Sequence, residues 1–353
     1  MNGDDGSAYA KAGVDIDAAT RAVELMKGHI RSTYNTEVVS DVGLFGGLTD
    51  VSFLRDYQHP VLVQSIDGVG TKMIVAEMMG QFTIGQCLVH HCVNDILAQG
   101  AVPINFIDYV AAARLDPEVI EQILREMAFA CRAIGIPIIT GETAEMPGVY
   151  QEGKHDVAGC ITGVVEKDSI IDGSKIKEGD VLIGLPSSGL HTSGYSLARR
   201  AFFETAGYGV DTFMDELGCT IGEELLKIHR SYLATVRPLL GRDDIQIRGV
   251  AHITGGGFFD NIGRLLQDGL YAEISYQWKI PPVFRLIQKL EGVSDKEMRR
   301  VFNLGIGMML IVPSGQVSAV RSVLAESGEP DNLLIGEIKK ARSGDKEKVV
   351  FSY

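Results

Sequence analysis

A charged, turn-rich segment near the middle of the chain most constrains the fold. It spans Glu166–Gly179 and reads EKDSIIDGSKIKEG, with apolar runs alternating on both sides of it. The chain has 353 residues, whereas a domain usually holds about 100–200. We therefore predict two domains, residues 1–168 and residues 169–353. Because the runs do not alternate strictly between strand and helix, we expect two α+β domains with mixed sheets.

Hydrophobic spacing places the main elements of both halves. In the first half, helices are expected at 18–33, 83–99 and 117–134, and strands at 61–66, 103–110, 136–140 and 157–165. In the second half, strands are expected at 181–185, 247–253 and 307–312, and helices at 195–204, after 257 and at 317–326. Two short strands are expected at the C-terminal end.

The charge balance narrows the classes of partner. The net charge is -13 at pH 7, and such a surface repels DNA and anionic lipid. We therefore expect neither nucleic acid nor a membrane as a main partner. The five cysteines are odd in number and suggest no disulfide framework. With a polar N-terminus and no apolar run near the roughly 20 residues of a membrane span, the sequence predicts a cytoplasmic protein.

The stretch Ser65–Lys72, SIDGVGTK, places a glycine turn after an apolar strand. Its spacing does not fit a Walker A loop, in which lysine directly follows the second glycine. Asp67 stands at the strand end beside Gly68 and Gly70, where a phosphate could approach the backbone. A carboxylate there can hold Mg²⁺, which bridges nucleotide phosphates. A plain turn with a solvated aspartate is the alternative.

Two further groups could hold a metal. Cys87, His91 and Asp95 recur every four residues and share one helix face. Zinc is conceivable there, but no second ligand cluster stands out in the sequence, and Asp95 could instead join Asp67 at a shared metal. The segment GETAEMPG places Glu142 in an expected strand-end loop, where a solvated surface turn is the alternative.

Two loops of the second half could hold an anion. Serine, threonine and glycine surround His191 in SSGLHTSGYS, just before an expected helix. In HITGGGFFDNIGR, three glycines lead into a helix that carries Arg264. Backbone N–H groups at a helix start favour phosphate, and histidine can act as an acid or a base. For each loop, a structural turn is an equally good interpretation.

Taken together, the motifs resemble the phosphoribosylformylglycinamidine cyclo-ligase (AIR synthetase) family. The matching strings, in family order, are AGVDID, DGVGTK, CVND, QGA, GETAEMPG, DVAG, IIDGSK, SSGLHTSGYS, HITGGGF and FNLGIGM. The resemblance implies an ATP-dependent ring closure in purine biosynthesis. Its substrate would be formylglycinamidine ribonucleotide, and its products aminoimidazole ribonucleotide, ADP and phosphate. It also implies a homodimer with a sheet or barrel formed between subunits.

The resemblance further implies residue roles. Asp67, Asp95 and, less directly, Glu142 would bind Mg²⁺. His191 and Asp95 would be catalytic. Contacts to ATP or to the ribose phosphate are expected from Gly68, Gly70, Thr71, Lys72, Asn94, Gly255, Gly256 and Gly257.

Three other interpretations stay open at this point. Selenophosphate synthetase and thiamine-monophosphate kinase belong to the same ATP-binding superfamily. The former typically uses a reactive cysteine or selenocysteine near the N-terminus, whereas this chain has no cysteine before Cys87. The third is a non-catalytic dimeric homologue.

Overall fold

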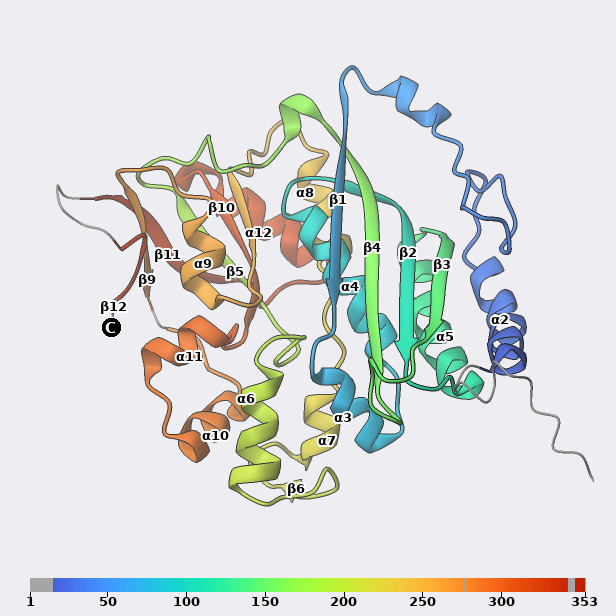
Figure 1. Cartoon of the computed structure of the whole chain (residues 1–353). Helices are drawn as coiled ribbons and strands as arrows, with labels where there is room; N and C mark the ends of the chain where they lie inside the picture. Colours follow the sequence, from blue (N-terminus) through green and yellow to red (C-terminus); the bar gives the residue numbers. More distant parts are fainter. Residues whose placement is uncertain (1–14, 276, 342–346, 353) are drawn as a thin grey trace, which may run out of the picture.

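The computed structural model describes residues 15–275, 277–341 and 347–352. Two mixed sheets, each with its own helices, lie beside one another (Figure 1). No helix in these ranges is both long enough and apolar enough to cross a membrane. The first three residues of the AGVDID motif, 12–14, lie outside the described residues.

The first sheet is built from the N-terminal half. Its order is β1–β4–β2–β3, with β2 and β3 parallel and the other pairs antiparallel. The strands are β1 (Pro60–Gly68), β2 (Val102–Ala112), β3 (Ile138–Glu145) and β4 (His155–Glu166). The helices of this half are α2 (Ile16–Arg31), α3 (Lys72–Met79), α4 (Ile84–Leu97) and α5 (Pro117–Ile134). Helices α4 and α5 lie behind the sheet in Figure 1 and leave its front face without a helix.

The second sheet takes all its strands from the C-terminal half, in the order β12–β9–β11–β5–β10–β8. The strands are β5 (Val181–Pro186), β8 (Gly249–His252), β9 (Leu270–Ser275), β10 (Ile306–Val312), β11 (Leu333–Lys340) and β12 (Val349–Ser352). Every residue of β10 is buried, so both faces of this sheet are covered at its centre. The two sheets share no strand, and the boundary at residue 168 stays a prediction.

Short helices and one small hairpin complete the C-terminal half. The helices are α6 (Tyr195–Arg199), α7 (Ile221–Leu225), α8 (Leu233–Leu240), α9 (Gly257–Gly263), α10 (Pro282–Glu291), α11 (Asp295–Val301) and α12 (Val317–Glu326). The hairpin pairs β6 (Phe213–Met214) with β7 (Cys219–Thr220). Helix α8 packs against α4 of the first half, so the two halves are in direct contact.

The expected helix 117–134 is confirmed, and its ends show why the sequence encodes it. The Asp116 side chain accepts hydrogen bonds from the N–H groups of Glu118 and Val119, while Pro117 occupies the first turn. Gly135 ends the helix with a φ of 78°, a conformation that glycine adopts without strain.

Two expected boundaries are wrong. Strand β3 does not end at Thr140 but continues through Gly141–Glu145, because these residues pair in parallel with Asp108–Ala112 of β2. The helix expected at 195–204 is α-helical only to Arg199 and continues as a π-helix over Arg200–Thr205. Glu142 therefore lies on a strand and not in a loop.

A buried lysine connects the two halves. Lys72, at the start of α3, is fully buried. Its Nζ donates hydrogen bonds to the carbonyl oxygens of His191 at 2.9 Å and Lys227 at 2.6 Å, both in the C-terminal half. Burial lowers the pKa of this ammonium group. A buried carbonyl that loses its donor is costly, so this contact holds the halves in one arrangement.

Lys72→Met should therefore destabilise the protein by about 1–3 kcal/mol, because both carbonyls lose a donor. Lys296→Met is the matched control, since the Lys296 side chain is 76% exposed and its ion-pair partner Glu347 is 67% exposed. That variant should change stability by less than about 1 kcal/mol. Urea unfolding of both variants measures the difference. Equal stability of the Lys72 and Lys296 variants would contradict the proposed connection.

A second buried polar group lies within the first sheet. Asp108 of β2 is buried, and this burial raises the pKa of its carboxyl group to about 7, with the Glu142 charge adding to the effect. In the unfolded chain an aspartate has a pKa of about 3.9. The folded state therefore binds the proton more strongly, and stability falls as the pH rises from about 4 to about 7.

Asp108→Asn removes this titration and should stabilise the protein most at high pH. The gain over wild type should be larger at pH 8 than at pH 5 by roughly 2–3 kcal/mol. Chemical denaturation at both pH values measures it. A gain that does not vary with pH would show that Asp108 is ionised in the folded protein.

Candidate active site

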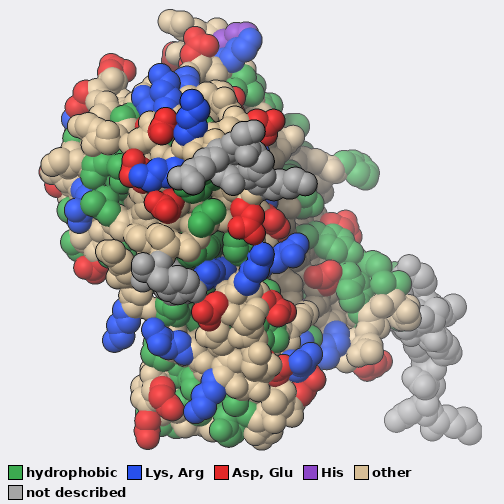
Figure 2. Space-filling model, turned by 90° about the vertical axis from the view of Figure 1, so that its left-hand side faces the viewer, with side chains coloured by type: hydrophobic (Ala, Val, Ile, Leu, Met, Phe, Trp, Pro, Cys, Tyr) green, Lys and Arg blue, Asp and Glu red, His purple; other side chains and the backbone are tan. Residues whose placement is uncertain are grey.

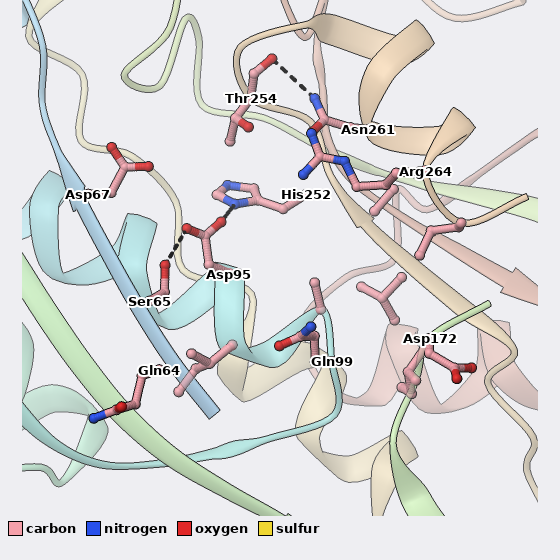
Figure 3. Close-up of a pocket in the computed structure, with 16 residues that line it drawn as sticks. Gln64, Ser65, Asp67, Asp95, Gln99, Asp172, His252, Thr254, Asn261 and Arg264 are labelled. Atoms are coloured by element: carbon pink, nitrogen blue, oxygen red, sulfur yellow. Dashed lines mark hydrogen bonds and ion pairs between the residues drawn. The ribbon is translucent and has the colours of Figure 1, made fainter. Parts of the chain in front are cut away.

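Asp67 and Asp95 lie near each other at the edge of one cavity (Figure 3), and His91 contacts Asp67 and approaches Asp95. Asp67 lies near the end of β1 and Asp95 in α4. His91 Nε2 is 2.9 Å from Asp67 Oδ2 and 3.8 Å from Asp95 Oδ2. Asp95 also accepts hydrogen bonds from Ser65 Oγ at 2.9 Å and from His252 Nδ1 at 2.8 Å. The fold thus brings together two carboxylates that are 28 residues apart in sequence, 95 minus 67.

Both carboxylates are held in their ionised form. Burial alone would raise the pKa of Asp67, but the hydrogen bond from His91 and its charge outweigh this and lower the pKa. Burial is likewise outweighed at Asp95, where His252 lowers the carboxyl pKa. The pKa of His91 is raised, because its two carboxylate neighbours outweigh burial. The site therefore has negative charge available for a cation.

A cavity of about 510 Å³ opens beside these carboxylates. Its walls come from both halves, with β1 and α4 on one side and β8 and α9 on the other. Figure 3 shows Arg264, the residue that directly follows α9, facing the cavity across from Asp95, and Asp172 on a further side. Other polar lining residues are Gln64, Gln99, Thr254 and Asn261. The cavity thus offers acidic, basic and neutral polar groups to one ligand.

The triple-glycine loop lies between β8 and α9, at one end of this cavity. Gly257 has a φ of 57°, and a Cβ there would lie 2.0 Å from the carbonyl oxygen of Arg299. Only glycine fits such a position. Asn261 Nδ2 donates to the carbonyl oxygens of Gly257 at 2.8 Å and Gly255 at 3.2 Å, and so holds the loop. Gly256, between these two glycines, has a φ of 89°.

The turn after β1 is placed as the sequence predicts. Gly68 N–H donates to Asp67 Oδ1 at 2.6 Å, and Gly70 adopts a φ of 53°. Thr71 Oγ1 lies 3.2 Å from Ser196 Oγ, at the start of α6. The turn therefore faces the SSGLHTSGYS segment of the other half.

Two of the expected nucleotide contacts do not face the cavity. Lys72 directs its ammonium group to backbone carbonyls, as described above. Asn94 is fully buried, where its Oδ1 accepts from Tyr232 N–H at 2.9 Å and its Nδ2 donates to the Arg230 carbonyl at 2.8 Å. In this conformation both side chains hold segments of the C-terminal half, and neither is available to a nucleotide.

Glu142 does not join Asp67 and Asp95 within one chain. Asp67 pairs across the sheet with Gly159, Gly159 with Asp108, and Asp108 with Gly141. Since neighbouring residues of a strand point to opposite faces, Glu142 faces away from the side that carries Asp67. Three strand spacings of about 4.8 Å also separate their rows. The expectation of a third carboxylate in one shared cluster is corrected accordingly.

His191 lies next to the carboxylates but belongs to a histidine cluster. It is buried and has a φ of 62°, which is uncommon for any residue other than glycine. Its ring stacks on His229, with centroids 4.0 Å apart. Burial lowers the pKa of His191 well below its ordinary value, with further lowering from nearby cationic groups, so the ring is neutral at neutral pH.

Sequence reasoning missed His229 and undervalued His252. His252 opens the quoted HITGGG string and directly contacts Asp95, so the string itself could have indicated it. His229 stands in the segment between α7 and α8, outside any quoted motif. Only the folded chain shows that it contacts both Asn94 and His252.

Each half of the chain matches a family of known proteins. Residues 50–165 match the family "AIR synthase related protein, N-terminal domain", and residues 177–347 match "AIR synthase related protein, C-terminal domain". A relative from Geobacillus sp. (strain WCH70), named phosphoribosylformylglycinamidine cyclo-ligase, is 48% identical over 336 residues, covering 94% of this chain and 96% of the relative. A relative of the same name from Alkaliphilus oremlandii (strain OhILAs) is 45% identical over 332 residues, with the same coverage.

A solved structure shares the fold at lower identity. The hydrogenase maturation protein HypE in complex with ATP superposes with a TM-score of 0.63 at 18% identity, covering 99% of this chain and 92% of HypE. At this identity the likeness concerns the fold alone. The extended matches to the cyclo-ligases decide the family: the chain belongs to the phosphoribosylformylglycinamidine cyclo-ligase (AIR synthetase) family.

Proposed function

We propose that this chain is an ATP-dependent cyclo-ligase that acts in the cytoplasm at the cavity beside Asp67 and Asp95. Its reaction converts formylglycinamidine ribonucleotide and ATP to aminoimidazole ribonucleotide, ADP and phosphate. The observation that carries the proposal is the pair of ionised carboxylates at the junction of the two halves, in a chain 48% identical to a named cyclo-ligase. The ATP complex of a protein with the same fold also supports nucleotide binding.

The residues present fit a magnesium ion. Asp67 and Asp95 both line the cavity, and magnesium prefers carboxylate oxygen and phosphate oxygen ligands. Mg²⁺ bound there would neutralise the charge of the ATP phosphates during phosphoryl transfer. His91 favours the ionised form of Asp67, and His252 favours that of Asp95. Glu142 of the same chain is not included, because it lies on the other face of the sheet.

The chemistry requires activation of a poor leaving group. Transfer of the ATP γ-phosphoryl group to the formamide oxygen of the substrate gives an imidate phosphate and ADP. The amidine nitrogen then forms a C–N bond to the activated carbon, the C–O bond to phosphate breaks, and the nitrogen loses a proton. The protein contributes mainly by holding both ends of one substrate close together and by stabilising charge.

The opposite wall of the cavity suits the ribose phosphate of the substrate. Arg264 presents a cationic group there, and Thr254 precedes the triple-glycine loop. Guanidinium groups bind phosphate oxygens in a paired geometry. The loop lets a phosphate approach the backbone at Gly255 and Gly256, where a side chain would otherwise intervene. ATP and the ribonucleotide would therefore occupy different walls of one cavity.

The uncovered face of the first sheet suits a second copy of this chain. Ile66 and Leu62 of β1 are 71% and 56% exposed on that face. Ile66 pairs across the sheet with Cys160, and Cys160 with Ile107, which extends the apolar row. Contiguous exposed apolar rows mark interaction sites. By contrast, charged side chains of both signs are spread over the C-terminal face (Figure 2). We infer a homodimer formed by the first sheet.

Purified protein should form ADP and a diazotisable aminoimidazole in equal amounts when supplied with formylglycinamidine ribonucleotide, Mg²⁺ and ATP. Both products are quantified from one reaction mixture. ADP without aminoimidazole would contradict the proposal in favour of a kinase. If neither product appears, the chain is a non-catalytic homologue.

Asp67→Asn and Asp95→Asn should each lower kcat by roughly 10²-fold or more, because each removes a charge that the metal requires. Asp244→Asn is the control, since Asp244 is exposed and pairs with Arg242 at the surface. Circular dichroism verifies that the three variants fold. Wild-type rates in both site variants would exclude the carboxylates from the reaction.

Ile66→Glu should convert the dimer to a monomer, because it would bury charges without partners at the interface. Leu334→Glu is the control, since Leu334 is 46% exposed on β11 of the other sheet. Size-exclusion chromatography with light scattering should give about 76 kDa, twice the 38.2 kDa of one chain, for wild type and the control. A dimeric Ile66→Glu variant would rule out this face as the interface.

A further inference from the structure

The segment between β8 and α9 has the geometry of a type II turn. Gly257 N–H donates to the Thr254 carbonyl oxygen at 3.0 Å, which closes a turn of four residues. Gly256, the third residue of this turn, has a φ of 89° and a ψ of -10°. These are type II values, and glycine is favoured at this position. Type I and type II turns differ by a flip of the central peptide, so the surroundings of the turn decide its direction.

Asn261 holds this central peptide, which joins Gly255 to Gly256. Its Nδ2 donates to the carbonyl oxygens of Gly255 at 3.2 Å and Gly257 at 2.8 Å. In a trans peptide the C=O and the N–H point in opposite directions. Because the Gly255 carbonyl points toward Asn261, the Gly256 N–H points away from it. No acceptor for this N–H lies among the residues that the structure describes.

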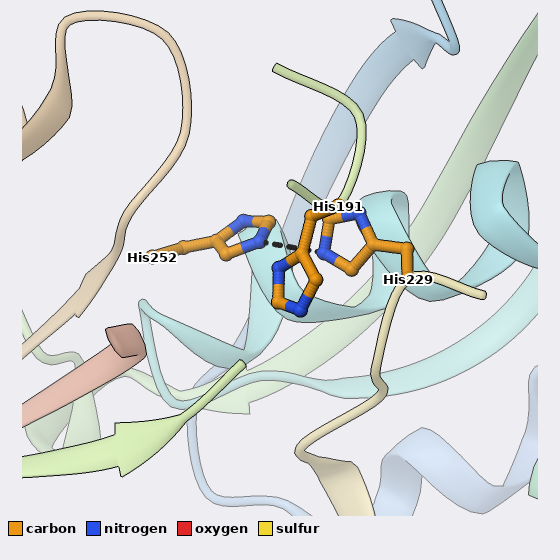
Figure 4. Close-up of side chains that lie close together, drawn as sticks. All are labelled: His191, His229 and His252. Carbon is orange, nitrogen blue, oxygen red and sulfur yellow. Dashed lines mark hydrogen bonds between the residues drawn. The ribbon is translucent and has the colours of Figure 1, made fainter. Parts of the chain in front are cut away.

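Both ends of the turn are fixed by other parts of the fold. His252, two residues before the turn, donates to Asp95 Oδ1 at 2.8 Å. Figure 4 shows its ring directed toward His229, and the Nε2 atoms of the two rings are 3.1 Å apart. At the other end, a Cβ on Gly257 would lie 2.0 Å from the Arg299 carbonyl oxygen, so the backbone is closely packed there. The central peptide is therefore the part of the turn whose direction depends on Asn261.

The outer side of the turn is open. Gly255 is exposed, and a Cβ added there would meet no atom within 4 Å. Its φ is not positive, so neither packing nor backbone conformation requires glycine at this position. A glycine of this kind leaves room for a ligand to approach the backbone. Thr254, which begins the turn, and Arg264, which follows α9, both line the cavity beside the carboxylates.

We propose that Asn261 is a positioning residue for the ribose phosphate of the substrate, an inference that rests on the proposed function. Asn261 acts through the turn and does not bind the phosphate itself. By holding the Gly255 carbonyl, it directs the Gly256 N–H to a phosphate oxygen, while Arg264 supplies positive charge. Backbone N–H groups fixed in a turn form anion-binding concavities, and a donor that is already oriented need not be ordered when the ligand binds.

A thermodynamic cycle that combines Asn261 with the ligand phosphate tests this role. Isothermal titration calorimetry without ATP measures binding of formylglycinamidine ribonucleotide and of its dephosphorylated nucleoside to wild type and to Asn261→Leu. Leucine has a similar size and no donor. The preference for the ribonucleotide over the nucleoside should fall by at least about tenfold in the variant, because a hydrogen bond to a charged group contributes roughly tenfold or more in affinity. Nucleoside affinity should be nearly unchanged.

Asn332→Leu is the matched control. Asn332 is also buried, and its Nδ2 donates to the Glu329 carbonyl oxygen at 2.7 Å, just before β11 and away from the cavity. This variant should keep the wild-type preference for the ribonucleotide. Equal weakening of both ligands in Asn261→Leu would indicate a merely structural role and overturn the proposal. An unchanged preference in that variant, or a wild-type protein without any preference, would overturn it as well.

A crystal structure of the wild-type protein with formylglycinamidine ribonucleotide gives a second readout that needs no variant. We expect the Gly256 nitrogen about 2.7–3.2 Å from a phosphate oxygen, with Asn261 Nδ2 still at the Gly255 carbonyl. A phosphate bound by the Asn261 side chain, or held away from the turn, would overturn the proposal.

The outcomes are distinct from those that test the proposed function. Formation of aminoimidazole ribonucleotide by wild type, with an unchanged phosphate preference in Asn261→Leu, would overturn the positioning role alone. If wild type forms no aminoimidazole ribonucleotide but Asn261→Leu loses the preference, the positioning role is supported and the ligase activity is contradicted.

Discussion

The contact of Asp67 with His91 is the interaction on which the site depends. It connects the end of β1 to the middle of α4 at 2.9 Å, and it directs the Asp67 carboxylate toward Asp95. Without a cationic or hydrogen-bonding neighbour, burial would favour the protonated acid. The histidine thus keeps negative charge at a position where the second half of the chain closes the cavity. The His91 side chain therefore links the charge of the Asp67 carboxylate to the packing of the two halves around the cavity.

Buried polar groups connect the halves at several further points. Lys72 donates to two carbonyls of the C-terminal half, and Asn94 holds the segment from Arg230 to Tyr232. His252 reaches from β8 to Asp95. Buried polar groups of this kind are costly unless their partners stay in place, so they favour one relative arrangement of the sheets. The candidate active site and the contact between the halves consequently share residues.

Much of the fold was predictable from local patterns. The helix at 117–134 carries its own start and stop residues, and the strands at 61–66 and 157–165 lie within β1 and β4. The end of β3 was not predictable, because Gly141–Glu145 become a strand only by pairing with β2. The π-helix after Arg199 likewise left no recognisable pattern in the sequence. Long-range pairing, and not local propensity, decides where β3 ends.

The site was predictable in part. Asp67 and Asp95 follow from strand-end and helix-face reasoning, and the structure brings them together. The prediction that Glu142 joins Asp67 and Asp95 was wrong. Glu142 follows Gly141 on β3, and a shift of one residue along a strand places the side chain on the opposite face of the sheet. Lys72 and Asn94 occur within recognisable strings, yet a string does not show which way a side chain points. His229 lies in no motif, and its importance arises only from contacts with residues more than 20 positions away.

The most direct test of the account is a crystal structure with a non-hydrolysable ATP analogue and Mn²⁺ in place of Mg²⁺. Anomalous scattering locates the manganese ion without ambiguity. The account predicts an anomalous peak in contact with both Asp67 and Asp95 and with the phosphates of the nucleotide. Nucleotide bound elsewhere, with the two carboxylates turned apart and no ion near them, would contradict it.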